Sequence, residues 1–295
     1  MADTLPPGVV GGGPEQSPMY HAENSGRYDR QLLIREYQQR YDCRLAVVFD
    51  AIFPYSLNVF EDLVYDADPS KDLHLLLATP GGDGEAALRL VRSAQARCHK
   101  LVVIVPDQAK SAGTLVALGA HQILMGPTSD LGPVDPQLTL NPANPQELSS
   151  AKDLIAAVDQ AVESVQKSPD TYPLHAAMLA NVNALMVQQA RSAIARTSDL
   201  ALEALQANPD RTEAQATELW ASKLSKPLME DSRSHAAAFG ADAALAAGLP
   251  VTKVDPSDPQ WRLIWRLWMK YFTRYERIYE GERASKVLGP WQQPG

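Results

Sequence analysis

The sequence predicts an α/β protein built around a parallel sheet, with further helices towards the C-terminus. Between residues 44 and 119, short apolar runs rich in Val, Leu and Ile alternate with amphipathic segments. This pattern is typical of βαβ units around a buried parallel sheet. Gly81 and Gly82 end one apolar run, and Ser111 follows the next. Because loops at the carboxyl ends of parallel strands gather at one edge, we expect these residues to meet there.

The elements of this core are predicted in a regular order. Residues 1–27 are rich in Pro, Gly and small polar residues, which predicts a flexible N-terminal arm. Apolar periodicity predicts helices at 28–41, 56–66, 85–96 and 112–119, and strands at 44–52, 73–78 and 100–105.

The composition of the chain changes after Gln137, where Pro and polar residues predict a segment that leaves the core. Helical patterns follow at 147–167, 173–207 and 212–222. An Ala-rich helix at 241–247 then leads into Gly248, which predicts a helix stop followed by a short strand.

Residues 256–295 carry a concentrated set of aromatic and basic side chains. From 260 to 281 the aromatics recur at helical spacing on one broad face, mixed with Arg and Lys. We expect an aromatic-basic C-terminal helix that docks on its own domain or on a neighbouring subunit. The alternative is peripheral membrane contact, because interfacial helices combine the same residue types.

Composition excludes several classes of protein. A chain of 295 residues with 45% hydrophobic content can bury a sizeable core. The net charge of −8 and the lack of a dense Lys/Arg stripe argue against a nucleic-acid partner. Two distant cysteines, Cys43 and Cys98, and six scattered histidines predict reduced thiols and no metal or other cofactor. No run approaches the ~18 apolar residues of a membrane span, so we expect a soluble, cytoplasmic protein.

Three motifs follow one another in the core, namely Thr79-Pro80-Gly81-Gly82, Lys110-Ser111-Ala112-Gly113-Thr114 and Leu131-Gly132-Pro133-Val134-Asp135-Pro136-Gln137. With them, residues 40–255 resemble the Clp/crotonase superfamily, in particular the signal peptide peptidase A and serine dehydrogenase proteinase branch of serine peptidases. The resemblance implies a Clp/crotonase-like core of repeated ββα/βαβ units over residues 28–255, with a helical insertion at about 138–230. It also implies a homo-oligomer, in which the added helices cover the active-site groove and make subunit contacts.

Ser111 is the expected nucleophile, because a Ser at a strand-to-helix turn exposes its hydroxyl beside a helix N-terminus. A simple N-cap is the alternative role for this residue. The backbone N–H groups of Gly82 and Ala112 are expected to form the oxyanion hole, since glycine lets backbone approach a developing oxyanion. Gly81, Gly113 and Asp135 are expected to contact the substrate.

The general base is left open between Lys152 and His235. The Clp protease subunit takes a His from the strand after the nucleophile helix, but residues 129–137 contain none. Lys152 lies 41 residues after Ser111 at the start of a predicted helix, which resembles the Ser-Lys dyad of stomatin-cleaving peptidases. Such a lysine must be neutral, which requires burial without a carboxylate partner, and Asp153 lies next to it.

His235 lies in a Ser-rich stretch before an Ala-rich helix, which resembles serine dehydrogenase proteinases. Lys110 directly precedes the nucleophile and is expected to be structural, because adjacent residues at a turn point apart.

These features together predict an oligomeric serine peptidase that hydrolyses extended, hydrophobic peptide segments through an acyl-enzyme on Ser111. In the superfamily such substrates add as a strand near the Gly pair. One alternative is a catalytically weak or inactive oligomeric scaffold or effector-binding module on the same fold. Another is crotonase-type thioester chemistry, against which the Lys-Ser-Ala-Gly motif argues.

Overall fold

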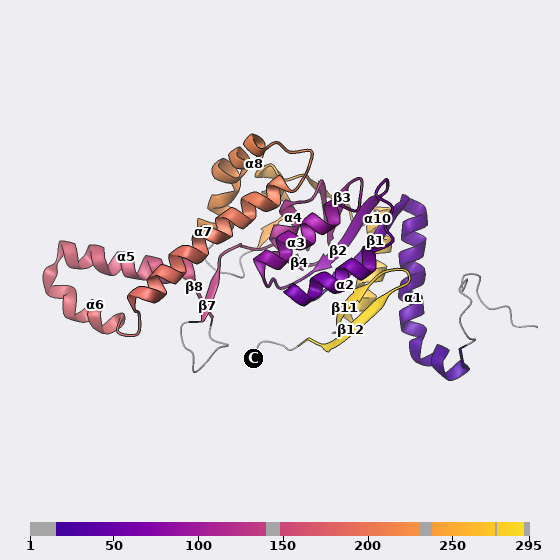
Figure 1. Cartoon of the computed structure of the whole chain (residues 1–295), viewed down its shortest axis with the longest axis horizontal. Coiled ribbons are helices and arrows are strands. Elements are labelled where there is room, and N and C mark those ends of the chain that lie inside the picture. Colours follow the sequence, from indigo (N-terminus) through magenta and orange to yellow (C-terminus); the bar gives the residue numbers. More distant parts are fainter. Residues whose placement is uncertain (1–15, 140–147, 231–237, 275, 292–295) are drawn as a thin grey trace, which may run out of the picture.

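A seven-stranded sheet lies at the centre of the molecule, in the order β10-β5-β3-β2-β1-β11-β12 (Figure 1). The structure, a computed structural model, describes residues 16–139, 148–230, 238–274 and 276–291. The five strands from β10 to β1 are parallel, and β11 and β12 are antiparallel additions beside β1. The strands are β1 Cys43–Phe49, β2 Asp72–Ala78, β3 Leu101–Val105, β5 Gln122–Met125, β10 Val251–Lys253, β11 Glu276–Glu280 and β12 Ser285–Pro290. The predicted α/β class with a mostly parallel sheet is confirmed.

Helices cover both faces of this sheet, which explains why its central strands β1, β2 and β3 are largely apolar. Successive side chains of a strand point to opposite faces. Accordingly, Ala46 and Val48 join the core beneath one group of helices, while Leu45 and Val47 join a second core on the other face. The first face is covered by α2 Pro54–Val64, α3 Gly84–Gln95, α4 Ala112–Leu118 and part of α7 Ala184–Gln206, and the second by α1 Pro18–Tyr41 and α10 Pro259–Phe272.

Smaller elements connect this core to an arm of helices. A three-stranded sheet has the order β4-β6-β9, and β7 pairs with β8 as a separate hairpin. The helices α5, α6 and the first part of α7 project from the body as a long arm (Figure 1). The remaining elements are β4 Gln108–Ala109, β6 Asp130–Leu131, β7 Gln137–Thr139, β8 Leu148–Ser150, β9 Phe239–Gly240, α5 Ala151–Lys167, α6 Tyr172–Met178, α8 Glu213–Leu219 and α9 Ala241–Ala246. A 3₁₀ turn spans Pro169–Thr171, and π-helical turns span Trp220–Leu224 and Lys226–Glu230.

The helical boundaries differ from the predicted ones where side chains cap the backbone. The arm predicted to extend to residue 27 is already helical from Pro18, because Ser17 accepts a hydrogen bond from the N–H of Tyr20. The single helix predicted over 173–207 is two helices. The oxygen of Asn183 caps the second of them by accepting from the N–H of Met186 at 3.0 Å. Residues 1–15 lie outside the described chain.

The C-terminal segment departs most from its prediction. The helix expected to continue to residue 281 ends at Phe272, and the chain returns as β11, antiparallel to β1. Glu280 supplies the physical reason, since its buried carboxylate accepts two hydrogen bonds from Arg30, at 2.7 and 2.9 Å, and one from Tyr271 at 2.6 Å. This cluster ties α1, α10 and β11 together. The expected docking of the aromatic helix on its own domain is therefore what the structure shows.

Candidate active site

Ser111 lies in a strained turn between β4 and α4. Its backbone has φ 46° and ψ −107°, and Asp42 is the other non-glycine residue with positive φ in the described part of the chain. Holding a non-glycine residue in such a region costs about 1–3 kcal/mol, so the surrounding structure must impose it. Hydrogen bonds do so on both sides: the N–H of Lys110 donates to Thr79 at 3.0 Å, and the N–H of Gly113 donates to Lys110 at 2.7 Å.

The hydroxyl of Ser111 is not used to cap the helix that follows it. Ser111 stands at the N-cap position of α4, yet its side chain accepts no capping hydrogen bond. Within the described ranges, no hydrogen bond to its Oγ occurs, and the residue is partly buried rather than enclosed. The N-cap interpretation therefore does not account for this serine, and its hydroxyl is available for chemistry.

Gly81 packs directly against the serine. A Cβ on Gly81 would stand 2.9 Å from the Cβ of Ser111 and 3.2 Å from the carbonyl oxygen of Lys110. Its φ of +118° is also one that other residues rarely adopt. Both constraints require glycine here, so Gly81 lies beside Ser111 as the sequence predicts.

Gly82 directs its backbone N–H away from β1. The carbonyl of Gly81 accepts a hydrogen bond from Ile52 at 2.8 Å, and in a planar trans peptide the N–H of the next residue points the opposite way. Ile52 lies on the β1 side, whereas the segment 108–111 pairs on the other side of Thr79. The exposed N–H of Gly82 thus faces the side of the sheet that carries Ser111.

The N–H of Ala112 completes the arrangement expected of an oxyanion hole. It belongs to the first residue of α4, where helical N–H groups have no partner within the helix. In the part of the chain that the structure describes, neither this group nor the N–H of Gly82 donates to a backbone carbonyl. Neither N–H is therefore used by the backbone, and the oxyanion hole expected from Gly82 and Ala112 stays a prediction.

Gly113 has a packing role in the structure. A Cβ at this position would lie 2.4 Å from Cγ2 of Thr79 and 3.1 Å from the Cβ of Ala109. Glycine therefore lets α4 approach the end of β2. The substrate contact expected for Gly113 stays a prediction.

Two neighbours support the turn but were not singled out from the sequence. The hydroxyl of Thr114 donates to the carbonyls of Ala109 and Gly132, both at 2.8 Å, and accepts from the N–H of Gly132 at 3.0 Å. Asp130 forms an ion pair with Lys110 at 2.6 Å. This ion pair agrees with the predicted structural role of Lys110. Thr114 belongs to the second motif and Asp130 directly precedes the third, but the contacts that they make depend on the fold.

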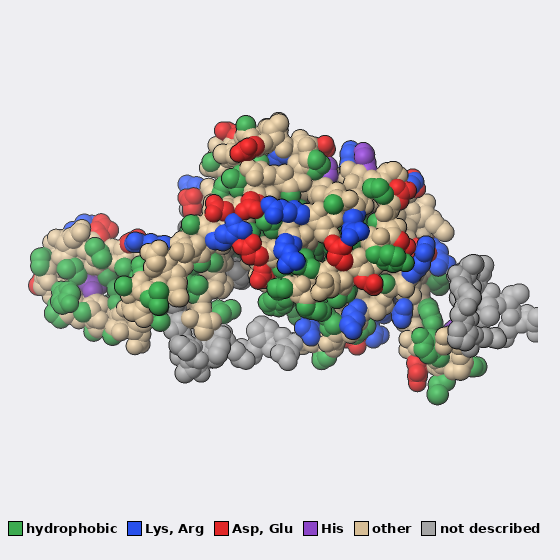
Figure 2. All heavy atoms as spheres, in the orientation of Figure 1, with side chains coloured by type: hydrophobic (Ala, Val, Ile, Leu, Met, Phe, Trp, Pro, Cys, Tyr) green, Lys and Arg blue, Asp and Glu red, His purple; other side chains and the backbone are tan. Residues whose placement is uncertain are grey.

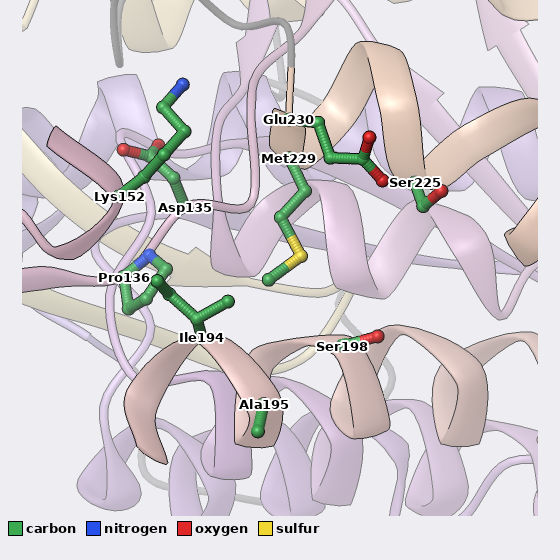
Figure 3. A pocket seen from close by; sticks show the side chains of 9 residues that line it. All are labelled: Asp135, Pro136, Lys152, Ile194, Ala195, Ser198, Ser225, Met229 and Glu230. Atoms are coloured by element: carbon green, nitrogen blue, oxygen red, sulfur yellow. The ribbon is translucent and has the colours of Figure 1, made fainter. Parts of the chain in front are cut away.

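Lys152 and Asp135 line one cavity of about 270 Å³. Figure 3 shows them side by side on one wall, with Met229 and Glu230 opposite and α7 below. Asp135 is almost fully buried and accepts a hydrogen bond from the side chain of Gln137 at 2.9 Å. The N–H of Ala151 donates to the carbonyl of Pro136, which holds the start of α5 against the third motif. The structure thus places Lys152 and Asp135 in the lining of the same cavity. Ser111 is not among the residues that line this cavity.

The second candidate base, His235, lies outside the described residues. His74 is buried and forms a hydrogen bond with the hydroxyl of Tyr37 at 2.7 Å, where burial lowers its pKa to about 4. The ring of His121 accepts from the N–H of Leu101 on the opposite end of the sheet. Neither belongs to the turn at Ser111. Over the described ranges, no cluster of three or more His, Cys, Asp or Glu side chains could hold a metal ion, and no helix is long and apolar enough to span a membrane.

Part of the chain matches a known protein family. Residues 63–168, which include Gly81, Ser111 and Lys152, match the family described as ClpP-like SDH-type serine proteinase. The uncharacterized protein MJ0137 of Methanocaldococcus jannaschii is 44% identical over 77 residues, which cover 26% of this chain and 27% of that protein. The membrane-bound protease PH1510 of Pyrococcus horikoshii is 31% identical over 99 residues, covering 32% and 22% of the two chains.

Similarity to solved structures extends over more of the chain at lower identity. A mutant of the 1510-N membrane-bound stomatin-specific protease, in complex with a substrate peptide, is 16% identical with a TM-score of 0.43, covering 83% of this chain and 86% of that one. The chain spans only about a quarter of the length of the curated relatives it matches. The resemblance predicted from the sequence is nevertheless confirmed, because the segment that carries Gly81, Ser111 and Lys152 matches the family described as ClpP-like SDH-type serine proteinase.

Proposed function

We propose that the protein is a serine peptidase with Ser111 as its nucleophile. The observation that carries this proposal is the strained turn, which presents an unbonded hydroxyl beside Gly81. In the reaction, Oγ attacks the carbonyl carbon of a peptide while its proton passes to a base. The tetrahedral intermediate collapses to an acyl-enzyme as the leaving amine takes that proton, and water then hydrolyses the ester.

The N–H groups of Gly82 and Ala112 serve as the oxyanion hole in this proposal. Within the described residues neither N–H donates to a backbone carbonyl, so neither needs to break a backbone hydrogen bond when charge develops. Loss of one such donor typically costs about 100- to 1,000-fold in turnover.

Lys152 is the proposed base, and His235 the alternative. The position of Lys152 within the matched family segment, and its partly buried place beside apolar Ile194 and Met229, support this choice. Asp135 and Glu230 line the same cavity, and a lysine that acts as a general base must be neutral. Catalysis by Lys152 therefore requires that these carboxylates be paired elsewhere or turned away when substrate is bound.

The proposed substrates are extended peptides with hydrophobic side chains. Ile52, which pairs with Gly82, is followed by two large and substantially exposed aromatic residues, Phe53 and Tyr55. An extended chain bound near Gly82 could pair its main chain there and place apolar side chains on these rings. The specificity of the peptidase is then set by this aromatic rim.

A homo-oligomer is the proposed assembly, and the arm offers the surface for it. Residues 168–190 contain Asp170 as their single charged residue apart from His175. At the far end of the arm, hydrophobic side chains gather on the surface (Figure 2), with Leu174 61% and Met178 70% exposed. A neutral apolar tip can pack against a second copy without like-charge repulsion. Sedimentation velocity on the full chain and on Met178→Asp tests this: the variant should sediment as a smaller species, and a wild-type monomer would contradict the proposal.

Labelling with a fluorophosphonate tests the peptidase itself. The wild-type chain should be modified stoichiometrically at Ser111, and Ser111→Ala should not react. The carboxylates beside Lys152 give a specific reason to weigh the second candidate, an inactive scaffold on the same fold. Absence of labelling in the assembled protein, over a full pH range, would favour the scaffold.

A further inference from the structure

A buried carboxylate lies at the carboxyl end of β1, outside the turn that carries Ser111. Asp50 directly follows the strand and is 1% exposed. Its carboxylate accepts a hydrogen bond from the N–H of Ala51 at 2.8 Å, and Nε of Arg277 on β11 lies 3.8 Å away. Burial raises the pKa of Asp50, while the hydrogen bond from Ala51 and the charge of Arg277 oppose that rise. The reaction proposed for Ser111 does not use this group.

Two tyrosines interact with the Asp50 carboxylate, namely Tyr55 and Tyr279. For Tyr55, in the first turn of α2, burial and the charge of Asp50 raise the pKa of the phenol to about 12. The ring of Tyr55 also meets the ring of Tyr279 edge to face, with centroids 6.2 Å apart. The helix α2 lies against β11 at this place (Figure 1). Tyr55 therefore has contacts at both its hydroxyl and its ring, although it is 41% exposed.

The backbone that carries this ring is fixed by contacts other than those of Asp50. The N–H of Ile52 donates to the carbonyl of Gly81 at 2.8 Å. The hydroxyl of Ser56 accepts from the N–H of Phe53 at 3.0 Å, which closes the first turn of α2. These bonds hold the start of the helix beside the Gly pair. The carboxylate is thus left to orient the exposed ring rather than the backbone.

We propose that Asp50 is a positioning residue, which holds the ring of Tyr55 where an apolar side chain of a bound peptide packs on it. This inference rests on the proposed peptidase, in which an extended peptide lies near Gly82 and the rim of Phe53 and Tyr55 sets specificity. A ring that is fixed before binding loses less conformational entropy when the peptide packs on it. Asp50 therefore acts on the affinity for peptides with large apolar side chains, and not on the chemical step at Ser111.

Steady-state kinetics on internally quenched alanine peptides test this role. Each peptide carries a single Phe, scanned through the positions of the sequence, and the all-alanine peptide is the reference. Tyr55→Phe keeps the ring but removes the hydroxyl, so it should raise KM for the preferred Phe peptide by about 5-fold, with kcat and the KM of the reference unchanged. Asp50→Ala should have the same effect. The double variant should have no larger one, because both changes remove the same interaction.

Tyr65→Phe is the matched control, since it changes a 71% exposed tyrosine at the other end of α2 and should behave like wild type. Additive effects in the double variant, or equal effects of Asp50→Ala on both peptides, would overturn the proposal, because a carboxylate that only stabilises the fold does not change selectivity. Tyr55→Phe alone decides the question if Asp50→Ala does not fold. Wild-type selectivity in that variant would contradict the role of Asp50.

Fluorophosphonate labelling distinguishes this failure from failure of the proposed peptidase. Labelling of Ser111 together with unchanged selectivity in Tyr55→Phe would contradict the role of Asp50 and leave the peptidase intact. Absence of labelling in the wild-type chain would instead contradict the peptidase, and with it the positioning of a substrate by Asp50.

Discussion

Gly81 and Ser111 are in contact at the carboxyl edge of the sheet, so tightly that a methyl group on Gly81 would stand 2.9 Å from the Cβ of Ser111. The two residues are 30 positions apart and meet because Thr79 and Lys110 share a hydrogen bond at 3.0 Å. At this contact Ser111 has a positive φ of 46°. The position of the hydroxyl thus depends on a glycine as much as on the serine.

Substitutions at Ser111 should distinguish the backbone strain of its turn from the catalytic role of its hydroxyl. Ser111→Ala and Ser111→Gly should both abolish fluorophosphonate labelling and peptide hydrolysis, because neither has a hydroxyl. Ser111→Gly should also be more stable than Ser111→Ala by about 1 kcal/mol, since glycine adopts φ 46° without steric cost. Urea denaturation of both variants measures the difference. Equal stability would show that the turn is unstrained.

Lys152→Ala should reduce turnover by about 100-fold or more, and His235→Ala much less, if Lys152 takes the proton from Ser111. The kcat/KM of the wild type should then rise at a pH above the range in which an ordinary histidine titrates. A pH profile of peptide hydrolysis for the wild type and both variants checks this. The opposite ranking of the two variants would transfer the role to His235.

Gly81→Ala should abolish activity by displacing Ser111, because its Cβ meets the Cβ of the serine and the Lys110 carbonyl. Gly289→Ala is the matched control, since Gly289 has a similarly positive φ of 95° but nothing within 4 Å of an added Cβ. Both variants lose stability through backbone strain, and only the first should lose fluorophosphonate labelling. Labelling of folded Gly81→Ala at the wild-type rate would contradict the contact.

Glu280→Gln should destabilise the protein by about 3–5 kcal/mol, because it leaves the buried guanidinium of Arg30 without its counter-ion. Glu163→Gln, which breaks the exposed pair with Lys167 on α5, should change stability by less than about 1 kcal/mol. Urea unfolding of both variants provides the comparison. A small effect for Glu280→Gln would mean that β11 is not part of the folding unit.

His74 should make stability fall as the pH decreases. Burial lowers its pKa to about 4 in the folded protein, against about 6.5 when unfolded, so the unfolded chain binds more protons in that interval. The loss between about pH 6.5 and pH 4 amounts to about 3 kcal/mol. It should be absent from His74→Gln and retained in His175→Gln. Urea midpoints of the three proteins across this range measure it, and parallel curves for all three would contradict the assignment.

The order of the motifs and the alternation of apolar runs with amphipathic segments were enough to predict the parallel sheet. A buried parallel strand needs a continuous run of Val, Leu and Ile, as in 101–105, and such a run can be recognised in the local sequence. The same holds for Ser111, because its neighbours Ala112 and Gly113 mark a tight turn into a helix. Ser111 lies beside Gly81 because the two segments follow neighbouring strands of the sheet. The order of the predicted elements already implied that these strands are neighbours.

Tertiary structure alone decided the conformation of the C-terminal segment and the surroundings of Lys152. Residues 276–280 continue the aromatic pattern of a helix, yet they form a strand because Arg30, 250 positions away, pairs with Glu280 inside the core. Likewise, nothing local to Lys152 shows that Asp135 and Glu230 share its cavity. Local periodicity determines an element only where the helix or strand buries its own apolar side. Where a buried charge pairs with a residue far away in the sequence, that long-range contact sets the local conformation. The neighbouring sequence alone does not predict such a contact.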